Sequence, residues 1–448
     1  MTLATNSILI STDEALSLLE TVLKNSQAED VTVTVNNTET SLTRFSENQI
    51  SQNLTTTQFN LSITSHYGKR CATASTNELD PDAIIATIRR SEELACIAPE
   101  DPEWVPLLEP QIYDHRIPAF DLETAHLSPR WRGEMVQKVC QLSAKSNGEA
   151  SGTLSSEAVL FAVANSRGLQ ACNRLTSADF SVTARIETGS AWSQRTAWSV
   201  NQLPIELLTE TVINRALLSQ NPREVSPGIY PVVFDGAAFT DLLEWVIWNL
   251  DARAADEGRS FMSRTNSEGK SMGNRLGEQL FSPLIQVQRN PSHPLLQAST
   301  FFNNGMKKDD LEMIKNGIPL TLNYSRYWAQ KQGKTAQGGL FPLVMLGSNQ
   351  SLEDLIAQTE RGILVSRAWY VRSVNPRTLE VTGMTRDGTF WIDQGKIAYP
   401  IKNLRFNQSL PEMLGNVEAL SSVERYGNSV VPGVKVKAFN FSSITDSV

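Results

Sequence analysis

Short segments in which apolar and polar residues alternate recur along the chain, and they constrain its fold more than any other feature. The clearest is 31–35, Val-Thr-Val-Thr-Val, whose apolar side chains fall on one face of an extended backbone. Between such segments, apolar residues recur three and four positions apart, which is typical of amphipathic helices. No repeat of about 20–50 residues is visible, which argues against a solenoid.

The first hundred residues predict a small unit of helices and an antiparallel sheet. Ser11 and Glu14 form a capping box that opens a helix, and the pattern over 82–98 predicts a second helix. Short polar turns separate the segments between these helices, which favours a meander. The strands are expected at 31–35, 41–45, 51–57 and 59–65.

Two connectors divide the rest of the chain. Prolines cluster between 99 and 118, and the segment 221–228, Asn-Pro-Arg-Glu-Val-Ser-Pro-Gly, concentrates turn formers without periodicity. The fold class predicted is therefore α+β, with a small N-terminal helix and antiparallel-sheet domain, a strand-rich central region and a large strand-rich C-terminal domain. The expected boundaries are 1–100, 101–222 and 223–448.

Two segments of the C-terminal domain bear on a possible site. The strongly apolar segment 237–250 predicts a helix. The segment 263–277 is polar, contains glycine and lacks periodicity, so it predicts a mobile loop.

Charge and hydropathy exclude several classes of protein. The chain of 448 residues has 40 Lys and Arg against 48 Asp and Glu, a formal net charge of −8. A net acidic chain without a long basic run is a poor candidate for nucleic acid binding. No apolar stretch reaches roughly 18 residues, so no membrane span is predicted. Because the N-terminus also lacks a secretory pattern, the cytoplasm is the expected compartment.

Histidine and cysteine are scarce, with four of each. A metallopeptidase of the HExxH type needs two histidines on one helix face beside a general-base glutamate, and the motif is absent. No histidine has another within a helical turn or two, and the cysteines form no CxxC pair, so they are expected to be reduced and structural. These residues are His66, His115, His126 and His293, with Cys71, Cys96, Cys140 and Cys172.

Motifs for nucleotides and for serine nucleophiles also fail. The triplets 269–271 and 333–335 end like a phosphate-binding loop, but Arg264 and Trp328 stand where its first glycine belongs. Without that glycine the backbone amides cannot wrap a phosphate. The pattern GxSxG does not occur.

Several short motifs, in matching order over nearly the whole chain, resemble the TldD/PmbA family, whose members are also called modulators of DNA gyrase. The resemblance implies a peptidase-related protein. The motifs are 44–50 (RFSENQI), 67–71 (YGKRC), 165–168 (NSRG), 258–260 (GRS), 276–280 (LGEQL), 282–283 (SP), 387–396 (DGTFWIDQGK) and 400–402 (PIK).

The resemblance also implies where a zinc site would lie. Members of the TldD type are similar to zinc peptidases with HExxxH and a cysteine near the C-terminus. The equivalent segment here is 243–248, so Leu243 and Trp248 stand at the histidine positions, and no cysteine follows Cys172. Neither Leu nor Trp offers a lone pair suited to Zn²⁺. We therefore expect no metal and no other cofactor in this chain, and zinc only in a TldD-type partner.

Two acids remain at family positions. Glu244 keeps the position of the general base and is the one catalytic residue that the resemblance suggests, while Asp251 stands where a nearby family acid lies. Glu244 is open to two interpretations, a solvated or ion-paired helix acid and a polar group lining an ancestral cleft. The family usually has glycine before the second histidine, and Ile247 here lets the helix stay regular.

The resemblance favours a metal-less PmbA/TldE-like subunit that supports proteolysis of unfolded peptides by a zinc-bearing TldD-type partner. The oligomer is expected to be formed with that subunit or as a self-dimer, without nucleic acid or membrane. One alternative is a peptidase with an unrecognised site that uses Glu244, Asp251 and another chain's ligands. The other is a non-proteolytic protein-binding module. Whether the chain is itself an enzyme stays open.

Overall fold

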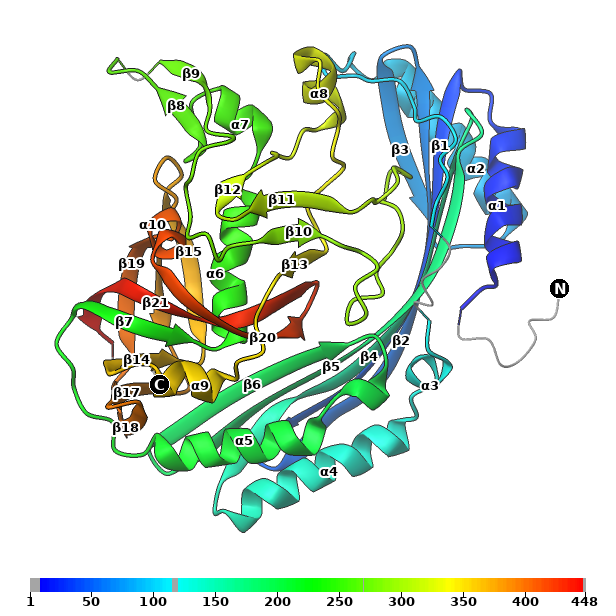
Figure 1. Ribbon diagram of the computed structural model, residues 1–448. Coiled ribbons are helices and arrows are strands. Elements are labelled where there is room, and N and C mark those ends of the chain that lie inside the picture. Colours follow the sequence, from blue (N-terminus) through cyan, green and yellow to red (C-terminus); the bar gives the residue numbers. More distant parts are fainter. Residues whose placement is uncertain (1–8, 115–119, 269, 446–448) are drawn as a thin grey trace.

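The computed structural model describes residues 9–114, 120–268 and 270–445, and it consists of a curved sheet that wraps around a second, larger sheet. The curved sheet has six strands in the order β3-β2-β1-β4-β5-β6, and the larger sheet has thirteen. Figure 1 shows the second half of the chain lying inside the concave side of the first sheet. The predicted α+β class is confirmed.

All six strands of the curved sheet are antiparallel to their neighbours, and most are long. The segments predicted as strands at 31–35 and 41–45 form a single strand of 17 residues. The sequence suggested a break because 36–40 lacks apolar residues, but β1 is paired on both sides there, by β2 and by β4. The strands are β1 (Asp30–Ser46), β2 (Gln49–Tyr67), β3 (Arg70–Thr76), β4 (Glu149–Asn165), β5 (Gln170–Ile186) and β6 (Gly189–Ala197).

Helices cover the convex face of this sheet. The capping box predicted at Ser11 and Glu14 is confirmed at the start of the first helix. Because β1 pairs with β4, strands from both sides of the boundary expected at 100/101 share one sheet, and the division into three domains stays a prediction. The helices are α1 (Thr12–Asn25), α2 (Pro81–Ile97), α3 (Leu122–Ala125), α4 (Pro129–Lys145), η1 (Val200–Gln202) and α5 (Ile205–Leu218).

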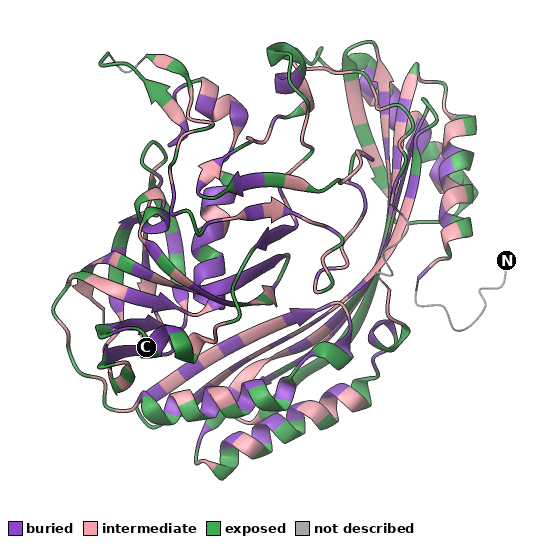
Figure 2. Cartoon of the chain, in the orientation of Figure 1, coloured by how far each residue is buried: buried purple, intermediate pink, exposed green. Residues whose placement is uncertain are grey.

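The second half is built on one long strand, β21 (Ser429–Ile444), which pairs with β7, β13, β19 and β20. The helix predicted at 237–250 forms α6 (Gly236–Trp248), and most of it is buried (Figure 2). The other helices are α7 (Ala252–Asp256), α8 (Arg326–Gln332), α9 (Leu352–Ala357) and α10 (Leu410–Gly415).

The strands of the second half are short, apart from β20 and β21. The loop predicted at 263–277 is wrong in part, because two short strands pair there as a hairpin. The strands are β7 (Gly228–Phe234), β8 (Ser263–Thr265), β9 (Ser271–Asn274), β10 (Val287–Arg289), β11 (Leu311–Lys315), β12 (Ile318–Pro319), β13 (Leu343–Met345), β14 (Arg361–Val365), β15 (Ala368–Asn375), β16 (Glu380–Thr385), β17 (Thr389–Asp393), β18 (Lys396–Pro400), β19 (Leu404–Ser409) and β20 (Val417–Tyr426).

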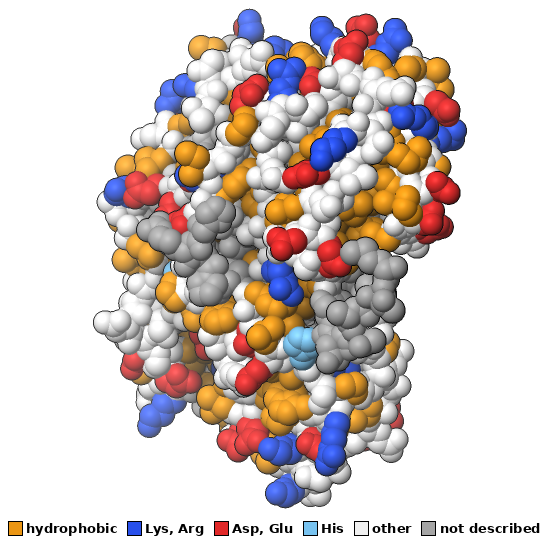
Figure 3. Space-filling view, turned by 90° about the vertical axis from the view of Figure 1, so that its right-hand side faces the viewer, with side chains coloured by type: hydrophobic (Ala, Val, Ile, Leu, Met, Phe, Trp, Pro, Cys, Tyr) orange, Lys and Arg blue, Asp and Glu red, His pale blue; other side chains and the backbone are white. Residues whose placement is uncertain are grey.

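The surface carries both signs of charge. On the face turned toward the right of Figure 1, basic and acidic side chains are interspersed among the residues drawn in colour (Figure 3). Among the described residues, no helix is both long enough and apolar enough to cross a membrane.

The contact between α5 and the first residue of β6 gives a test of the fold. A Cβ on Gly189 would lie 2.2 Å from the carbonyl oxygen of Ala216, whereas a Cβ on Gly133 would meet nothing closer than 3.8 Å. Gly189→Ala should therefore lower the free energy of unfolding by about 1–3 kcal/mol. Gly133→Ala, within α4, should raise it by roughly 0.5–1 kcal/mol. Urea denaturation measures both, and equal shifts of the two midpoints would contradict this packing.

Candidate functional site

The family helix α6 presents one polar face and one core face. Leu243 is fully buried in the core, whereas Trp248 at the helix end is 55% exposed. Glu244 is partly buried, and its Oε1 accepts a hydrogen bond of 2.6 Å from the hydroxyl of Ser429 at the start of β21. Burial raises the pKa of Glu244, and the bond from Ser429 offsets part of that rise.

A second acid, Asp241, lies one helical turn before Glu244. Burial raises its pKa to about 7, the charge of Glu244 adds to the rise, and Arg367 opposes it. The side chain of Asp241 is exposed at the surface, so it is only partly shielded from water, but the protein around its carboxyl still disfavours the charged form. A carboxyl that titrates near neutral pH can both accept and donate a proton. The sequence analysis missed Asp241, although its spacing of three residues from Glu244 puts both on one helix face.

Two tryptophans continue this face of α6. The rings of Trp245 and Trp248 meet edge to face, with their centroids 5.8 Å apart. The ring of Trp248 also lies beside that of Phe341, with the two centroids 6.3 Å apart. Positions 241, 244, 245 and 248 follow the helical spacing of three and four residues. The stripe therefore combines two carboxyls with an exposed aromatic surface.

The donor set around α6 does not fit a zinc ion. Leu243, which the resemblance aligns with a zinc ligand, lies in the core without a donor atom, and the ring of Trp248 offers no lone pair. Asp251 is occupied as the N-cap of α7, where it accepts a 2.7 Å bond from the amide of Ala254. Within 9–114, 120–268 and 270–445, no group of three or more His, Cys, Asp and Glu is placed to hold a metal.

The start of α6 is anchored by a buried ionic network. Asp235 is the N-cap residue, and its Oδ2 accepts a 2.9 Å bond from Arg215 of α5. Burial would raise the pKa of Asp235, but Arg215 and Arg195 outweigh it and hold that pKa below its usual range. Arg195 of β6 pairs with Glu424, which also accepts a 2.9 Å bond from the hydroxyl of Tyr426. Residues of the curved sheet and of α5 thus fix where α6 begins.

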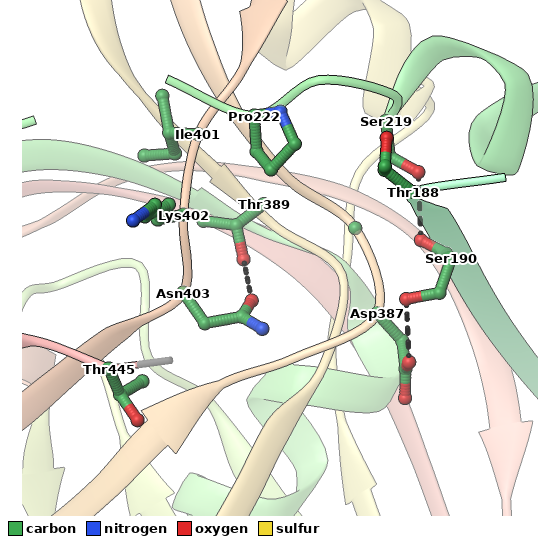
Figure 4. Close-up of a pocket in the computed structure, with 11 residues that line it drawn as sticks. Thr188, Ser190, Ser219, Pro222, Asp387, Thr389, Ile401, Lys402, Asn403 and Thr445 are labelled. Atoms are coloured by element: carbon green, nitrogen blue, oxygen red, sulfur yellow. Dashed lines mark hydrogen bonds between the residues drawn. The ribbon is translucent and has the colours of Figure 1, made fainter. Parts of the chain in front are cut away.

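A polar pocket of about 260 Å³ lies at the junction of the two halves (Figure 4). Ser190 of β6 donates a 3.0 Å bond to Asp387, and Thr389 donates a 3.1 Å bond to Asn403. No residue of α6 lines this pocket, so it is separate from the stripe. The lining residues are Thr188, Ser190, Ser219, Pro222, Asp387, Gly388, Thr389, Ile401, Lys402, Asn403 and Thr445.

Arg367 connects this pocket with α6. It pairs with Asp387 at 2.7 Å, and its guanidinium lies 4.2 Å and 4.3 Å from the ring centroids of Trp192 and Trp369. Its charge also acts on Asp241. Trp192 belongs to β6, so Arg367 joins the curved sheet, the pocket and the acid stripe.

Solved structures of known proteins identify the class of fold to which this chain belongs. Structures of this fold include TldE from Thermococcus kodakarensis, at a TM-score of 0.84 and 20% identity over 95% of this chain and 99% of that one. A protein from Bacteroides thetaiotaomicron, described as a candidate modulator of DNA gyrase, has a TM-score of 0.83 and 20% identity over 97% and 100%. Nearly the whole chain therefore shares the fold of these proteins.

Sequence profiles then give the family. The profile of the PmbA/TldA metallopeptidase C-terminal domain matches residues 227–443, and that of domain 1 matches residues 31–95. Metalloprotease PmbA of Escherichia coli O157:H7 is 23% identical over 401 residues, which are 84% of this chain and 85% of that protein. A PmbA homolog from Haemophilus influenzae is 25% identical over 231 residues, 50% of this chain and 48% of that protein. The chain belongs to the PmbA/TldD family.

The raised pKa of Asp241 predicts a pH dependence of stability. Since the folded-state pKa of about 7 exceeds the ordinary value of 3.8, the folded protein binds the proton more tightly. The contribution of the Asp241 carboxyl to the free energy of unfolding is therefore fully present below about pH 4, and it is lost as the pH rises through 7. Asp241→Asn should therefore be more stable than the wild type at pH 8, by about 1 kcal/mol after solvent screening.

Urea denaturation at pH 4, 6 and 8 measures this difference, which should shrink toward pH 4. Asp393→Asn, at an exposed site on β17, is the matched control for the loss of one charge. A difference between Asp241→Asn and the wild type that does not change with pH would contradict the assignment.

Proposed function

We propose that this chain is a metal-less, PmbA/TldE-like subunit that supports the proteolysis of unfolded peptides by a zinc-bearing TldD-type partner. The observation that supports the proposal is the packing of α6: Leu243, which the resemblance aligns with a zinc ligand, is fully buried, and Trp248, aligned with the other, is exposed. A subunit of this kind contributes surface and shape to the assembly rather than the metal. Its compartment in this proposal is the cytoplasm.

The names of the relatives support the proposal at the level of class. The Escherichia coli relative is called a metalloprotease, and the Thermococcus kodakarensis structure is a TldE. Trp245 and Trp248 provide an aromatic surface of the kind on which an extended peptide can pack. Glu244, held by Ser429, is in this proposal a polar group that borders the peptide rather than a general base acting on a metal-bound water.

A second candidate function is a peptidase whose site is completed by another chain. The observation that favours it is the pair of Asp241 and Glu244, since Asp241 titrates at about pH 7 and two adjacent carboxyls can act as acid and base. A non-proteolytic binding role is the third candidate. For that role, the net charge of −8 argues for a protein partner rather than DNA.

A reconstitution experiment tests the leading proposal. The purified chain, a zinc-bearing TldD-type protein from the same genome and their mixture are assayed on an unfolded polypeptide, and each is analysed for metal. We expect no zinc in this chain, co-elution of the two proteins and proteolysis that is much faster in the mixture than with either protein alone.

Variants of Glu244 separate the first two functions. Glu244→Gln keeps the shape of the side chain and the bond to Ser429 while removing the charge. The mixture should keep its activity within about threefold, because a residue that only borders the peptide takes no part in the chemical step. A loss of about a hundredfold or more, typical of a general acid–base residue, would favour the second function. Stoichiometric, tightly held zinc in this chain alone would exclude the first.

A further inference from the structure

The ammonium group of Lys308 stands out among the charges of the second half. Lys308 is partly buried in the loop between β10 and β11, which meets the curved sheet through a 3.0 Å bond from Asn173 of β5 to Ser299 (Figure 1). In the part of the chain that the structure describes, this ammonium group has neither an ion pair nor a hydrogen bond. The adjacent Lys307 differs, because it pairs with Asp309 at 2.8 Å. Lys308 is therefore a candidate to bind an anion from another molecule.

A second cation lies beside Lys308. The ammonium nitrogen of Lys308 is 4.8 Å from the centroid of the Phe302 ring, and the guanidinium carbon of Arg289 is 5.1 Å from the same centroid. Burial and the charge of Arg289 together lower the pKa of Lys308 to about 8. Partly buried cations without a counter-charge are costly, and such perturbed groups concentrate at functional sites.

Arg289 supplies a fixed positive charge at this place. Its side chain is 4% exposed, and its Nε and Nη1 each donate a 2.7 Å bond, to the carbonyl oxygens of Asp309 and Gln337. The carboxylates of Asp309 and Asp310 act on Arg289, but burial outweighs them and lowers its pKa. Because carbonyl groups are neutral, these bonds hold the guanidinium without cancelling its charge. An anion held by Lys308 would therefore be stabilised by Arg289 as well.

The two cations lie close to the aromatic surface of α6. The ring of Phe302 packs on the backbone of Gly338, where a Cβ would lie 2.6 Å from it. Phe341 follows three residues later, and its ring lies beside that of Trp248. Three residues span at most about 10 Å of extended chain. A peptide that packs on Trp248 is thus within a few residues' reach of Lys308.

We propose that Lys308, with Arg289 beside it, binds a carboxylate of the peptide that this subunit receives. The inference rests on the proposed function and adds the chemical class that the subunit recognises. Since Arg289 is buried and bonded to backbone carbonyls, Lys308 makes the direct contact. A compact ammonium matches a singly charged carboxylate, whereas phosphate is commonly bound through the two-pronged fork of an arginine. The bound carboxylate would in turn favour the charged form of Lys308.

Binding of short peptides to the full chain tests the proposal. Three unstructured peptides of equal length share an aromatic residue: one has a free C-terminus and a glutamine, one an amidated C-terminus and a glutamate, and one an amidated C-terminus and a glutamine. Calorimetry should show that the wild type binds the first or the second at least about tenfold more tightly than the third. The preferred peptide distinguishes a C-terminal carboxylate from one on a side chain.

Two variants show whether Lys308 is the cause of that preference. Lys308→Met keeps the length of the side chain without its charge, so it should abolish the preference and leave binding of the third peptide unchanged. Lys307→Met is the matched control and should keep the preference. Equal affinity of the wild type for all three peptides, binding of none of them, or a preference that Lys308→Met retains would overturn the proposal.

Acetylation of the wild type keeps the test decisive if Lys308→Met fails to fold. The preferred peptide, at ten times its dissociation constant, should slow the reaction of Lys308 with N-hydroxysuccinimide acetate by about tenfold, as measured by mass spectrometry, and should leave Lys307 unaffected. Equal acetylation of Lys308 with and without this peptide would overturn the proposal. Neither assay needs a TldD-type partner or proteolysis. A reconstituted mixture that digests nothing would therefore contradict the proposed function, while the carboxylate site is judged by these measurements alone.

Discussion

The position of α6 depends on one buried carboxylate, Asp235. As the N-cap of α6 it accepts a bond from the amide of Ala237, and it also pairs with Arg215 of α5. Burying a charge is costly unless it is paired, so Asp235 is stable only when α5 and α6 meet in this geometry. Gly236 is required beside it, since a Cβ there would lie 2.7 Å from the hydroxyl of Tyr426. The ionic network therefore holds the start of α6 against α5 of the first half.

The properties of the stripe on α6 follow from that placement. With the start of the helix fixed, Leu243 points into the core and Glu244 meets Ser429. Arg367 belongs to the same half as α6, lies over the rings of Trp192 and Trp369, and is close enough to act on Asp241. Arg367 is already paired with Asp387, so it only partly offsets the cost of charging Asp241. The raised pKa of Asp241 thus comes from burial and from the charge of Glu244, and Arg367 opposes it only in part.

Local signals in the sequence predicted local structure well. The capping box at Ser11 and the apolar helix at 237–250 both depend on residues within one or two turns, and both are found. The continuous strands β1 and β2 were divided in the prediction, because pairing on both sides of β1 holds polar segments such as 36–40 that have no strand pattern of their own. Arg367 and Asp241 are 126 residues apart in the chain, so no spacing rule could pair them. The expectation that Leu243 and Trp248 stand at ligand positions came from the resemblance rather than from a pattern, and it stays a prediction.

The regularity of α6 bears on the two positions, 243 and 248, that the resemblance aligns with zinc ligands. Positions five apart are separated by about 140° around a helix of roughly 3.6 residues per turn. Residues at such positions can share a metal only if the helix is distorted between them. Here α6 is continuous from Gly236 to Trp248, with Ile247 buried in the core and Trp248 turned outward. Histidines placed at 243 and 248 would therefore point to opposite environments, one of them into a core that has no partner for an imidazole. The packing of this helix is therefore incompatible with a metal shared between positions 243 and 248, because Leu243 is part of the core while Trp248 lies at the surface.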